Sequence, residues 1–266
     1  MKKHIAIANN RLKRVMEQRF TMIVANLQSV FALFIIVHFW KAIFINNGGE
    51  TIRGYTYTEI VTYYFLMRIM YNRVSTFGAS RFAKQIKSGE ITKILVKPVD
   101  LVGHFITDYV TGANLWSLGN LVTVLTMSSI FLHNVLVMPS NTIYGVLFLC
   151  VFMLNGFLTA VINLLLGLAG FWTTEVTHLK LITTQIIAIL SGGLIPLTFF
   201  PLWAQRVLSM LPFKYLIQFP IDIYFGKIPP QEIGVNLVIL TLWTLAFYFL
   251  TKLIYRKGAR IYESYN

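Results

Sequence analysis

The stretch Ile143–Trp172, IYGVLFLCVFMLNGFLTAVINLLLGLAGFW, decides the fold class because it contains no charged side chain. A helix needs about 20 apolar residues to cross a bilayer core about 30 Å thick. Only 12% of the 266 residues are charged, against about 25% in typical soluble domains. The chain therefore has too little polar surface for a soluble fold, and we expect an integral membrane protein.

Six stretches approach or exceed the length of a membrane span. They lie near Phe20–Ile45, Tyr57–Phe77, Phe105–Leu132, Ile143–Trp172, Leu179–Phe200 and Val235–Ile254. The first stretch is too long for the core of a signal peptide, and no small-residue cleavage pattern follows it. The sequence therefore predicts one all-α transmembrane domain over residues 1–266, with six membrane-spanning helices.

The basic residues are distributed unevenly around these spans. The chain has 23 Lys and Arg against 10 Asp and Glu, a net charge of +13, which in a soluble protein would suggest a nucleic-acid partner. On the predicted topology, 17 of the 23 lie on the side of the two termini, five lie on the other side, and Arg68 lies within a span. The positive-inside rule then places both termini in the cytoplasm of a multi-pass cell-membrane protein. The charge needs no nucleic acid to explain it.

Apolar residues recur at helical spacing in the amino-terminal segment, with basic residues between them. Ile5, Ala8, Leu12 and Val15 lie on one face, and Arg11, Lys13 and Arg14 lie between them. Residues 1–19 are therefore expected to form an amphipathic helix in the cytoplasmic interface. This helix either anchors the amino terminus or transmits motion.

The cytoplasmic loop 78–104 contains SRFAKQIKSGEITKILVKPVD. Phe82 and Ile86 are four residues apart, which predicts a short helix, and Gly89 is well placed to end it in a left-handed conformation. Pro98 then favours an extended chain at Lys97. A loop that only joins two spans could be far shorter. A solvated basic loop and a docking site for a partner both fit this pattern.

The external segment 196–230 holds six of the eight prolines but remains strongly apolar. It is too apolar for a free aqueous loop and too often interrupted by proline for one spanning helix. We expect one or two short re-entrant or interfacial helices, at Leu202–Leu211 and Tyr215–Phe225. They either cap the outer end of a transport pathway or form a plain extracellular cap.

Arg68 lies near the middle of the second predicted span. A lipid-facing arginine at that depth would cost at least ~2.5–3.5 kcal/mol. We therefore expect Arg68 to face a pathway, a partner subunit or an acidic side chain, and a structural ion pair satisfies the pattern equally well.

No known catalytic or metal-binding motif is present. The chain has no GxxxxGK[ST] phosphate loop and no HExxH pair. Glu175 and His178 have the Glu-x-x-His spacing of di-metal helix bundles, but no second copy of that motif exists. The acids form no cluster, and the single cysteine, Cys150, cannot form an intrachain disulfide. We expect no catalytic residue, no metal site and no cofactor bound by this chain.

Three segments together resemble a transporter family. They are KQIKSGEITKILVKPVD after the second span, FW at 171–172 at the end of the fourth, and SGGLIPLTFFP…LSMLPFKYLIQFP…YFG from 191 to 226. In this order they are similar to the permease subunits of ATP-binding cassette (ABC) exporters, in the six-span group of the type-two permease class. The resemblance covers essentially the whole chain.

The resemblance implies positions for two functional elements. The coupling helix would comprise Phe82, Ala83, Lys84, Gln85 and Ile86, followed by Lys87, Ser88, Gly89 and Glu90. The break into an external gate would comprise Ser191, Gly192, Gly193, Ile195 and Pro196. Arg68 matches no motif of the family.

The resemblance also implies a function and partners. Two identical or related permeases would work with separate ABC ATPase subunits, which bind the ATP and magnesium, and the missing phosphate loop here agrees with that division. The expected function is ATP-driven export of an amphiphilic or hydrophobic substrate. The main alternative is an ion-gradient-driven secondary transporter, which would need titratable groups such as Glu59, Asp108 or Glu175. A membrane enzyme or receptor scaffold is a third reading.

Overall fold

The computed structural model describes residues 19–49, 51–74, 77–88, 90, 102–114, 117, 121, 136–173 and 176–265. Most of them are helical, and they contain no strand beyond an isolated bridge between Ile52 and Tyr55. The named helices are α2 (Arg19–Asn46), α3 (Tyr57–Val74), α4 (Phe77–Lys87), α7 (Thr142–Leu168), η1 (Ala169–Phe171), α8 (Val176–Ser191), η2 (Leu197–Phe199), α9 (Leu202–Met210), η3 (Pro212–Leu216), α10 (Gln218–Tyr224) and α11 (Pro230–Tyr265). Residues 102–114 are also helical. The all-α prediction is confirmed, and the predicted interfacial helix 1–19 lies almost entirely outside the described residues.

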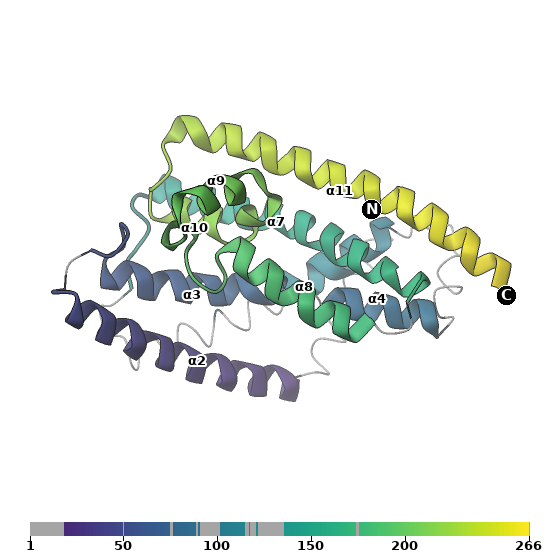
Figure 1. Ribbon diagram of the computed structural model, residues 1–266, viewed down its shortest axis with the longest axis horizontal. Helices are drawn as coiled ribbons and strands as arrows, with labels where there is room; N and C mark the ends of the chain where they lie inside the picture. The colour runs from purple at the N-terminus through teal and green to yellow at the C-terminus, as the bar shows by residue number, and fades with distance from the viewer. Residues whose placement is uncertain are drawn as a thin grey trace.

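The long helices run roughly side by side along the long axis of the molecule (Figure 1). Helices α2 and α11 form two edges of this view, and α3, α7 and α8 lie between them. Helix α7 packs against α4, α10 and α11, and α2 packs against α3. We call the end that carries α9 and α10 the α10 end, and the opposite end the α4 end.

Within the residues that the structure describes, three helices are long and apolar enough to cross a membrane. They contain Leu27–Asn46, Thr142–Phe171 and Pro230–Gly258, which correspond to the first, fourth and sixth predicted spans. Helix α3 corresponds to the second prediction but carries Arg68 and Arg73. Most of the third predicted span lies outside the described residues. The total of six spans therefore stays a prediction.

Helix α8 ends earlier than predicted, at Ser191 instead of Phe200. Gly192 follows with φ +84°. The Gly193 N–H donates to the Ala188 carbonyl at 2.7 Å, and the Gly192 N–H donates to the Ile189 carbonyl at 3.4 Å. This is a Schellman motif, in which a left-handed glycine ends a helix and satisfies its last carbonyls. The fifth span prediction was therefore too long at its carboxyl end.

The short helices expected between residues 196 and 230 are present. Helix α9 occupies Leu202–Met210, as predicted. The second expected helix is divided into η3 and α10 by Ile217, whose backbone (φ −134°, ψ −59°) is not helical. Pro212 begins η3, where its missing N–H costs no helical bond. Whether these helices re-enter the membrane stays a prediction.

Aromatic residues from three segments pack against one another at the α10 end. The rings of Trp40 and Phe199 lie 5.4 Å apart, and those of Tyr55 and Phe199 lie 6.2 Å apart. Trp40, Phe44 and Tyr55 are buried in the main core. These rings thus join α2, the loop before α3 and η2.

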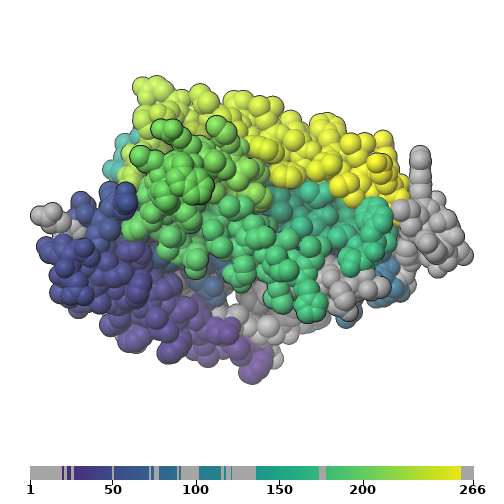
Figure 2. Space-filling model, viewed as in Figure 1, coloured from purple at the N-terminus to yellow at the C-terminus, as the bar shows by residue number. Residues whose placement is uncertain are grey.

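Large apolar side chains remain exposed along the outer helices. They include Phe31, Phe34 and Phe39 on α2, Ile182 and Ile186 on α8, and Leu242, Phe249 and Leu253 on α11. Figure 2 shows all three helices at the surface of one face. An apolar surface of this extent suits contact with lipid chains or another membrane subunit.

Candidate functional site

Helix α4 is amphipathic, and its apolar side faces the protein. Phe82, Ala83 and Ile86 are 1–2% exposed, whereas Lys84 and Lys87 are exposed. The short helix predicted between the second and third spans is thus present and ends at Lys87. Ser88 and Glu90 are also exposed, Gln85 is partly buried, and Gly89 lies outside the described residues. The side of α4 available to a partner is therefore basic and polar.

The apolar side of α4 sits directly on the end of α7 and on η1. A Cβ atom added at Gly167 would lie 3.0 Å from the Ala79 carbonyl, and one added at Gly170 would lie 3.0 Å from Ala83. The Phe82 ring packs edge-on against Phe105, with centroids 5.0 Å apart. Glycine at these positions allows the backbones to approach closely, as small residues do between membrane helices.

A buried polar network joins α4 to three other helical segments. The Asn163 side-chain oxygen on α7 accepts a hydrogen bond from the Ala79 N–H at 3.3 Å, and its amide donates to the Tyr109 hydroxyl at 3.0 Å. Tyr109 in turn donates to the carbonyl of Arg73 at the end of α3. Arg81 of α4 also forms an ion pair with Asp108. We call Arg73, Ala79, Tyr109 and Asn163 the α4 network.

Sequence reasoning missed the α4 network because its members are far apart in the chain. The available signal was Asn163, a polar amide inside an otherwise apolar span. A buried amide needs hydrogen-bond partners, so its presence indicates a contact with another segment, without saying which.

Arg73 lies within the second predicted span, Tyr57–Phe77, and its charge was counted on the cytoplasmic side. The structure places it in the last turn of α3, where it is 1% exposed. Its Nη1 donates to the Phe152 carbonyl, and its guanidinium carbon lies 4.0 Å from the centre of the Phe152 ring. A Cβ at Gly156 would overlap its Nη2. The absent side chain of Gly156 therefore makes room for the arginine.

Arg68 connects α3 to α2. Its Nη2 donates to the Ser29 hydroxyl, and its guanidinium carbon is 6.0 Å from the Tyr71 ring centre. Among the described residues Arg68 has no ion pair with a carboxylate. An acidic partner for Arg68, one of the possibilities from the sequence, is therefore not found among the described residues. Arg68 instead contacts Ser29 on α2.

The predicted break after α8 is held by tyrosines of α3. Tyr63 donates to the Gly192 carbonyl at 2.6 Å, and Tyr64 donates to the Leu194 carbonyl at 2.9 Å. Ser191, Gly192, Gly193 and Pro196 are buried and Ile195 is partly buried. The five residues thus form one continuous turn, whose free carbonyls are satisfied by another helix as buried backbone requires.

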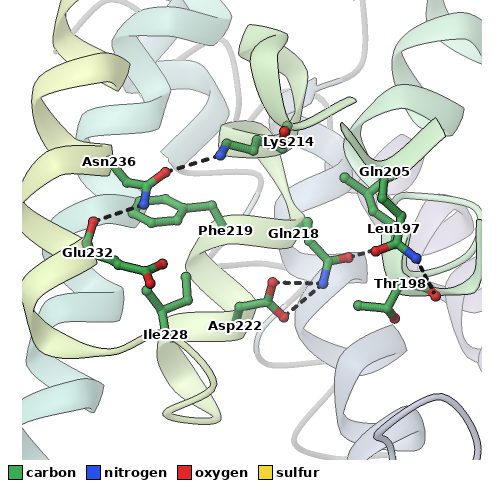
Figure 3. A pocket seen from close by; sticks show the side chains of 11 residues that line it. Leu197, Thr198, Gln205, Lys214, Gln218, Phe219, Asp222, Ile228, Glu232 and Asn236 are labelled. Atoms are coloured by element: carbon green, nitrogen blue, oxygen red, sulfur yellow. Dashed lines mark hydrogen bonds between the residues drawn. The ribbon is translucent and has the colours of Figure 1, made fainter. Parts of the chain in front are cut away.

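Gln218 of α10 is the centre of a second polar cluster at the α10 end, shown in Figure 3. Its side-chain oxygen accepts from the Leu197 N–H at 3.0 Å and shares the single Tyr63 hydroxyl proton, at 2.9 Å, with the Gly192 carbonyl. Its amide nitrogen donates to Tyr55 at 3.1 Å and to the Asp222 carboxylate at 2.7 and 2.9 Å. Gln218 therefore ties α10 to both α3 and the residues after the break.

Asp222 lies outside the candidate spans and beside this cluster. Burial raises the pKa of its carboxyl group from 3.8 to about 6, although hydrogen bonds from Gln218 and Tyr55 and the charges of Lys227 and Lys214 oppose the increase. The sequence analysis did not predict a role for Gln218 or Asp222, because the tyrosines that bind them, Tyr55 and Tyr63, are distant in the chain.

A secondary transporter would need titratable groups, and the two candidates within the described residues, Glu59 and Asp108, both bind neighbouring residues. Glu59 accepts from the Thr56 N–H at 2.8 Å while Thr56 accepts from the Glu59 N–H at 3.2 Å, which is a capping box at the start of α3. Lys227 lies 3.5 Å from the other Glu59 oxygen, and Asp108 pairs with Arg81. Glu175 lies outside the described residues.

Comparison with known protein families gives one match. The model of a family described as ABC-2 family transporter protein matches residues 30–266, which is most of the chain. No curated protein matches significantly. The match extends from the middle of α2 to the end of the chain, so it includes α4, the break after α8 and the Gln218 cluster. Members of this family are membrane transport components that work with ABC ATPases. The chain therefore belongs to the ABC-2 transporter family and is a multi-pass permease subunit of an ABC transporter.

Proposed function

We propose that this permease carries out ATP-driven export and that α4 is the element that receives the ATPase. The observation that carries the proposal is the division of α4 into a buried apolar side and an exposed side with Lys84, Lys87 and Ser88. ATP and magnesium are held by the partner ATPase, and this chain supplies no catalytic group.

The contacts of α4 support a role in transmitting motion. Phe82 and Ile86 pack against the membrane helices, and the α4 network binds the start of α4 to α7 and to the end of α3. An ATPase that pulls on α4 would therefore displace these helices together with it. Helix α3 continues to the α10 end, where Tyr63 and Tyr64 bind the residues after α8.

In this mechanism, nucleotide-driven closure of two ATPases draws two α4 helices together and tilts the permeases. An amphiphilic or hydrophobic substrate then moves outward between this chain and a second, identical or related permease, beneath the segment 196–230. The exposed apolar side chains of α2, α8 and α11 support a hydrophobic route and a permease partner. The distribution of basic residues supports cytoplasmic termini in the cell membrane.

The test separates docking from folding. The double variant Lys84→Glu and Lys87→Glu reverses two exposed charges without altering Phe82 or Ile86. We expect normal expression and thermal stability, loss of the ATPase during co-purification, and loss of transport. The matched control is Arg256→Glu with Lys257→Glu, two exposed basic residues on α11 toward the same end. Wild-type recovery of the ATPase with the α4 variant would contradict the proposal.

A further inference from the structure

A cavity of about 210 Å³ opens between η2, α9, η3, α10 and the start of α11 at the α10 end. Eight of its lining residues carry polar side chains: Thr198, Gln205, Ser209, Lys214, Gln218, Asp222, Glu232 and Asn236. Figure 3 shows these side chains around the same hollow, with Asp222 near its centre and Glu232 and Thr198 on either side. The cavity lies mostly within the segment 196–230, far from α4, and the coupling role proposed for α4 does not depend on it.

The lining offers more hydrogen-bond acceptors than donors. The Gln205 amide donates to the carbonyls of Thr198 and Phe200, which leaves its oxygen as an acceptor. Both polar atoms of Gln218 are occupied by protein partners. The Oδ2 atom of Asp222 receives one hydrogen bond, from Gln218 at 2.9 Å, and an ionised carboxylate oxygen accepts about two.

Thr198 is the most informative residue of the lining. Its Oγ1 is buried and has no hydrogen-bond partner among the described residues. A buried hydroxyl without a partner is uncommon and costs free energy. A ligand that hydrogen-bonds to the Thr198 hydroxyl, as donor or as acceptor, would reduce this cost when it binds.

The charges of the lining favour a cation. Asp222 and Glu232 contribute two carboxylates, and Lys214 contributes one ammonium group. The Lys214 ammonium donates to the Asn236 side-chain oxygen at 3.1 Å and lies 4.9 Å from the Tyr215 ring centre. These contacts hold it beside Asn236, so one ammonium group faces the two carboxylates of the lining. The charge of Lys227 also acts on Asp222, but its Nζ lies 3.5 Å from a Glu59 oxygen and therefore has a carboxylate partner of its own.

We propose that this cavity binds a protonated primary amine. An ammonium group carries one positive charge and three N–H donors, which match Asp222, Thr198 and the oxygen of Gln205 or Glu232. An alcohol offers one donor and no charge, and an anion would add acceptors to a site that already has too many. The volume is larger than the roughly 150 Å³ of an engineered cavity that holds benzene, so a small alkyl ammonium fits.

Two sources could supply this group at the membrane surface: the headgroup of phosphatidylethanolamine, or a small amine in solution. Both present the same –NH₃⁺ group to Asp222 and Thr198. Phosphatidylcholine provides a control for the lipid source, because its methylated nitrogen has no N–H to donate.

The experiment uses the full chain in phosphatidylcholine nanodiscs, without an ATPase, so its outcome is independent of the exporter proposal. Ethylammonium chloride is titrated while thermal unfolding is followed by tryptophan fluorescence, because a ligand that binds the folded state raises the unfolding temperature. We expect a saturable increase with ethylammonium and none with ethanol.

Three variants test the assigned contacts. Asp222→Asn and Thr198→Val should each weaken ethylammonium binding about tenfold or more, and Lys214→Met should strengthen it because a like charge is removed. Thr198→Val should fold as well as the wild type, because the lost hydroxyl has no partner in the part of the chain that the structure describes. Thr241→Val, on an exposed part of α11, should bind ethylammonium like the wild type.

The source is tested by adding phosphatidylethanolamine to the nanodiscs. A reduced response to ethylammonium identifies the lipid headgroup as the occupant, and an unchanged response identifies a soluble amine. Both results support an amine site. The proposal is wrong if ethylammonium has no effect, if Thr198→Val and Asp222→Asn bind it like the wild type, or if Lys214→Met weakens binding.

Discussion

At the scale of single residues, Gly192 combines two requirements that only glycine meets. Its φ of +84° is left-handed, and a Cβ there would lie 2.6 Å from the Tyr63 hydroxyl and 2.8 Å from the Gln218 oxygen. Gly48, which ends α2 in the same type of motif, has φ +77°, but a Cβ added there would have no neighbouring atom within 4 Å among the described residues. Substitutions at Gly192 and Gly48 therefore distinguish the cost of backbone strain, which both sites share, from the cost of crowding, which arises only at Gly192.

We predict that Gly192→Ala destabilises the fold more than Gly48→Ala. A left-handed alanine costs about 1–2 kcal/mol at either site. At Gly192 the methyl group also displaces the hydrogen bonds of Tyr63 and Gln218, and leaving buried polar groups unpaired adds about 1–3 kcal/mol. Thermal unfolding of both variants in detergent measures the difference. Equal shifts in unfolding temperature would show that the polar cluster does not depend on the glycine.

Asp222 predicts a pH dependence of stability. Its carboxyl has a pKa of about 6 when folded and about 3.8 when unfolded. Between these values the folded state binds more protons than the unfolded state, so the free energy of unfolding falls as pH rises from about 4 to about 6. A shift of this size corresponds to at most about 3 kcal/mol.

The measurement compares the unfolding temperatures of wild type and Asp222→Asn across this pH range. The variant should lack the wild type's decline, since an amide does not titrate. Lys214 and Lys227 keep their charge throughout the range, so they add no slope of their own. Parallel profiles for the two proteins would assign the pH dependence to other groups.

At the scale of elements, α4 is joined to its neighbours by close packing and by the α4 network together. Gly167 and Gly170 bring the backbones into contact, while Tyr109 links Asn163 to the carbonyl of Arg73. Apolar packing alone would allow α4 to slide, whereas directional hydrogen bonds hold its register against α3 and α7.

We predict that Tyr109→Phe weakens this connection. The change removes the donor to the Arg73 carbonyl and the acceptor for Asn163 in a buried site, which should cost about 1–3 kcal/mol of stability. It should also lower transport more than it lowers ATPase binding, because the exposed side of α4 is unchanged. Co-purification and transport assays on the same variant measure the two effects.

Tyr71→Phe is the control for that experiment. Tyr71 is a partly buried residue of α3, and its hydroxyl makes no hydrogen bond to another described residue. It should retain wild-type stability and transport. If Tyr109→Phe behaves like Tyr71→Phe, the network does not transmit motion.

At the scale of the whole molecule, the two ends differ in character. The α4 end presents Lys84, Lys87, Arg256 and Lys257, whereas the α10 end presents short helices rich in proline. Because Arg73 is buried, it can be left out of the basic residues counted on the cytoplasmic side, and the bias remains. The orientation predicted by that bias can be tested directly.

Cysteine labelling tests the orientation. Each variant carries a single cysteine at an exposed site in a Cys150→Ser background. Thr51→Cys places the thiol just before the start of α3, and Ser88→Cys places it just after the end of α4. An impermeant maleimide added to intact cells should label the first variant only. The second should react after the membrane is permeabilised. The reverse pattern would place the α4 end outside the cell.

Local patterns predicted the elements that local physics controls. The apolar length of Ile143–Trp172 predicted α7, the spacing of Phe82 and Ile86 predicted α4, and Pro201 and Pro212 bracketed α9. The left-handed glycine at 192 also ended α8 where the family resemblance placed a break, although the predicted span continued to Phe200. In each case the deciding groups lie within a few residues of one another.

The sequence by itself determined that this chain is helical, belongs in a membrane and has a basic side, because apolar length and charge distribution are properties of the chain. Only the tertiary structure decided that Arg73 is buried against Phe152, that Asn163 holds α4, and that Gln218 joins Tyr55, Tyr63 and Asp222. A buried polar group is stable only with its partners. Those partners come from helices distant in the chain, so packing selects them.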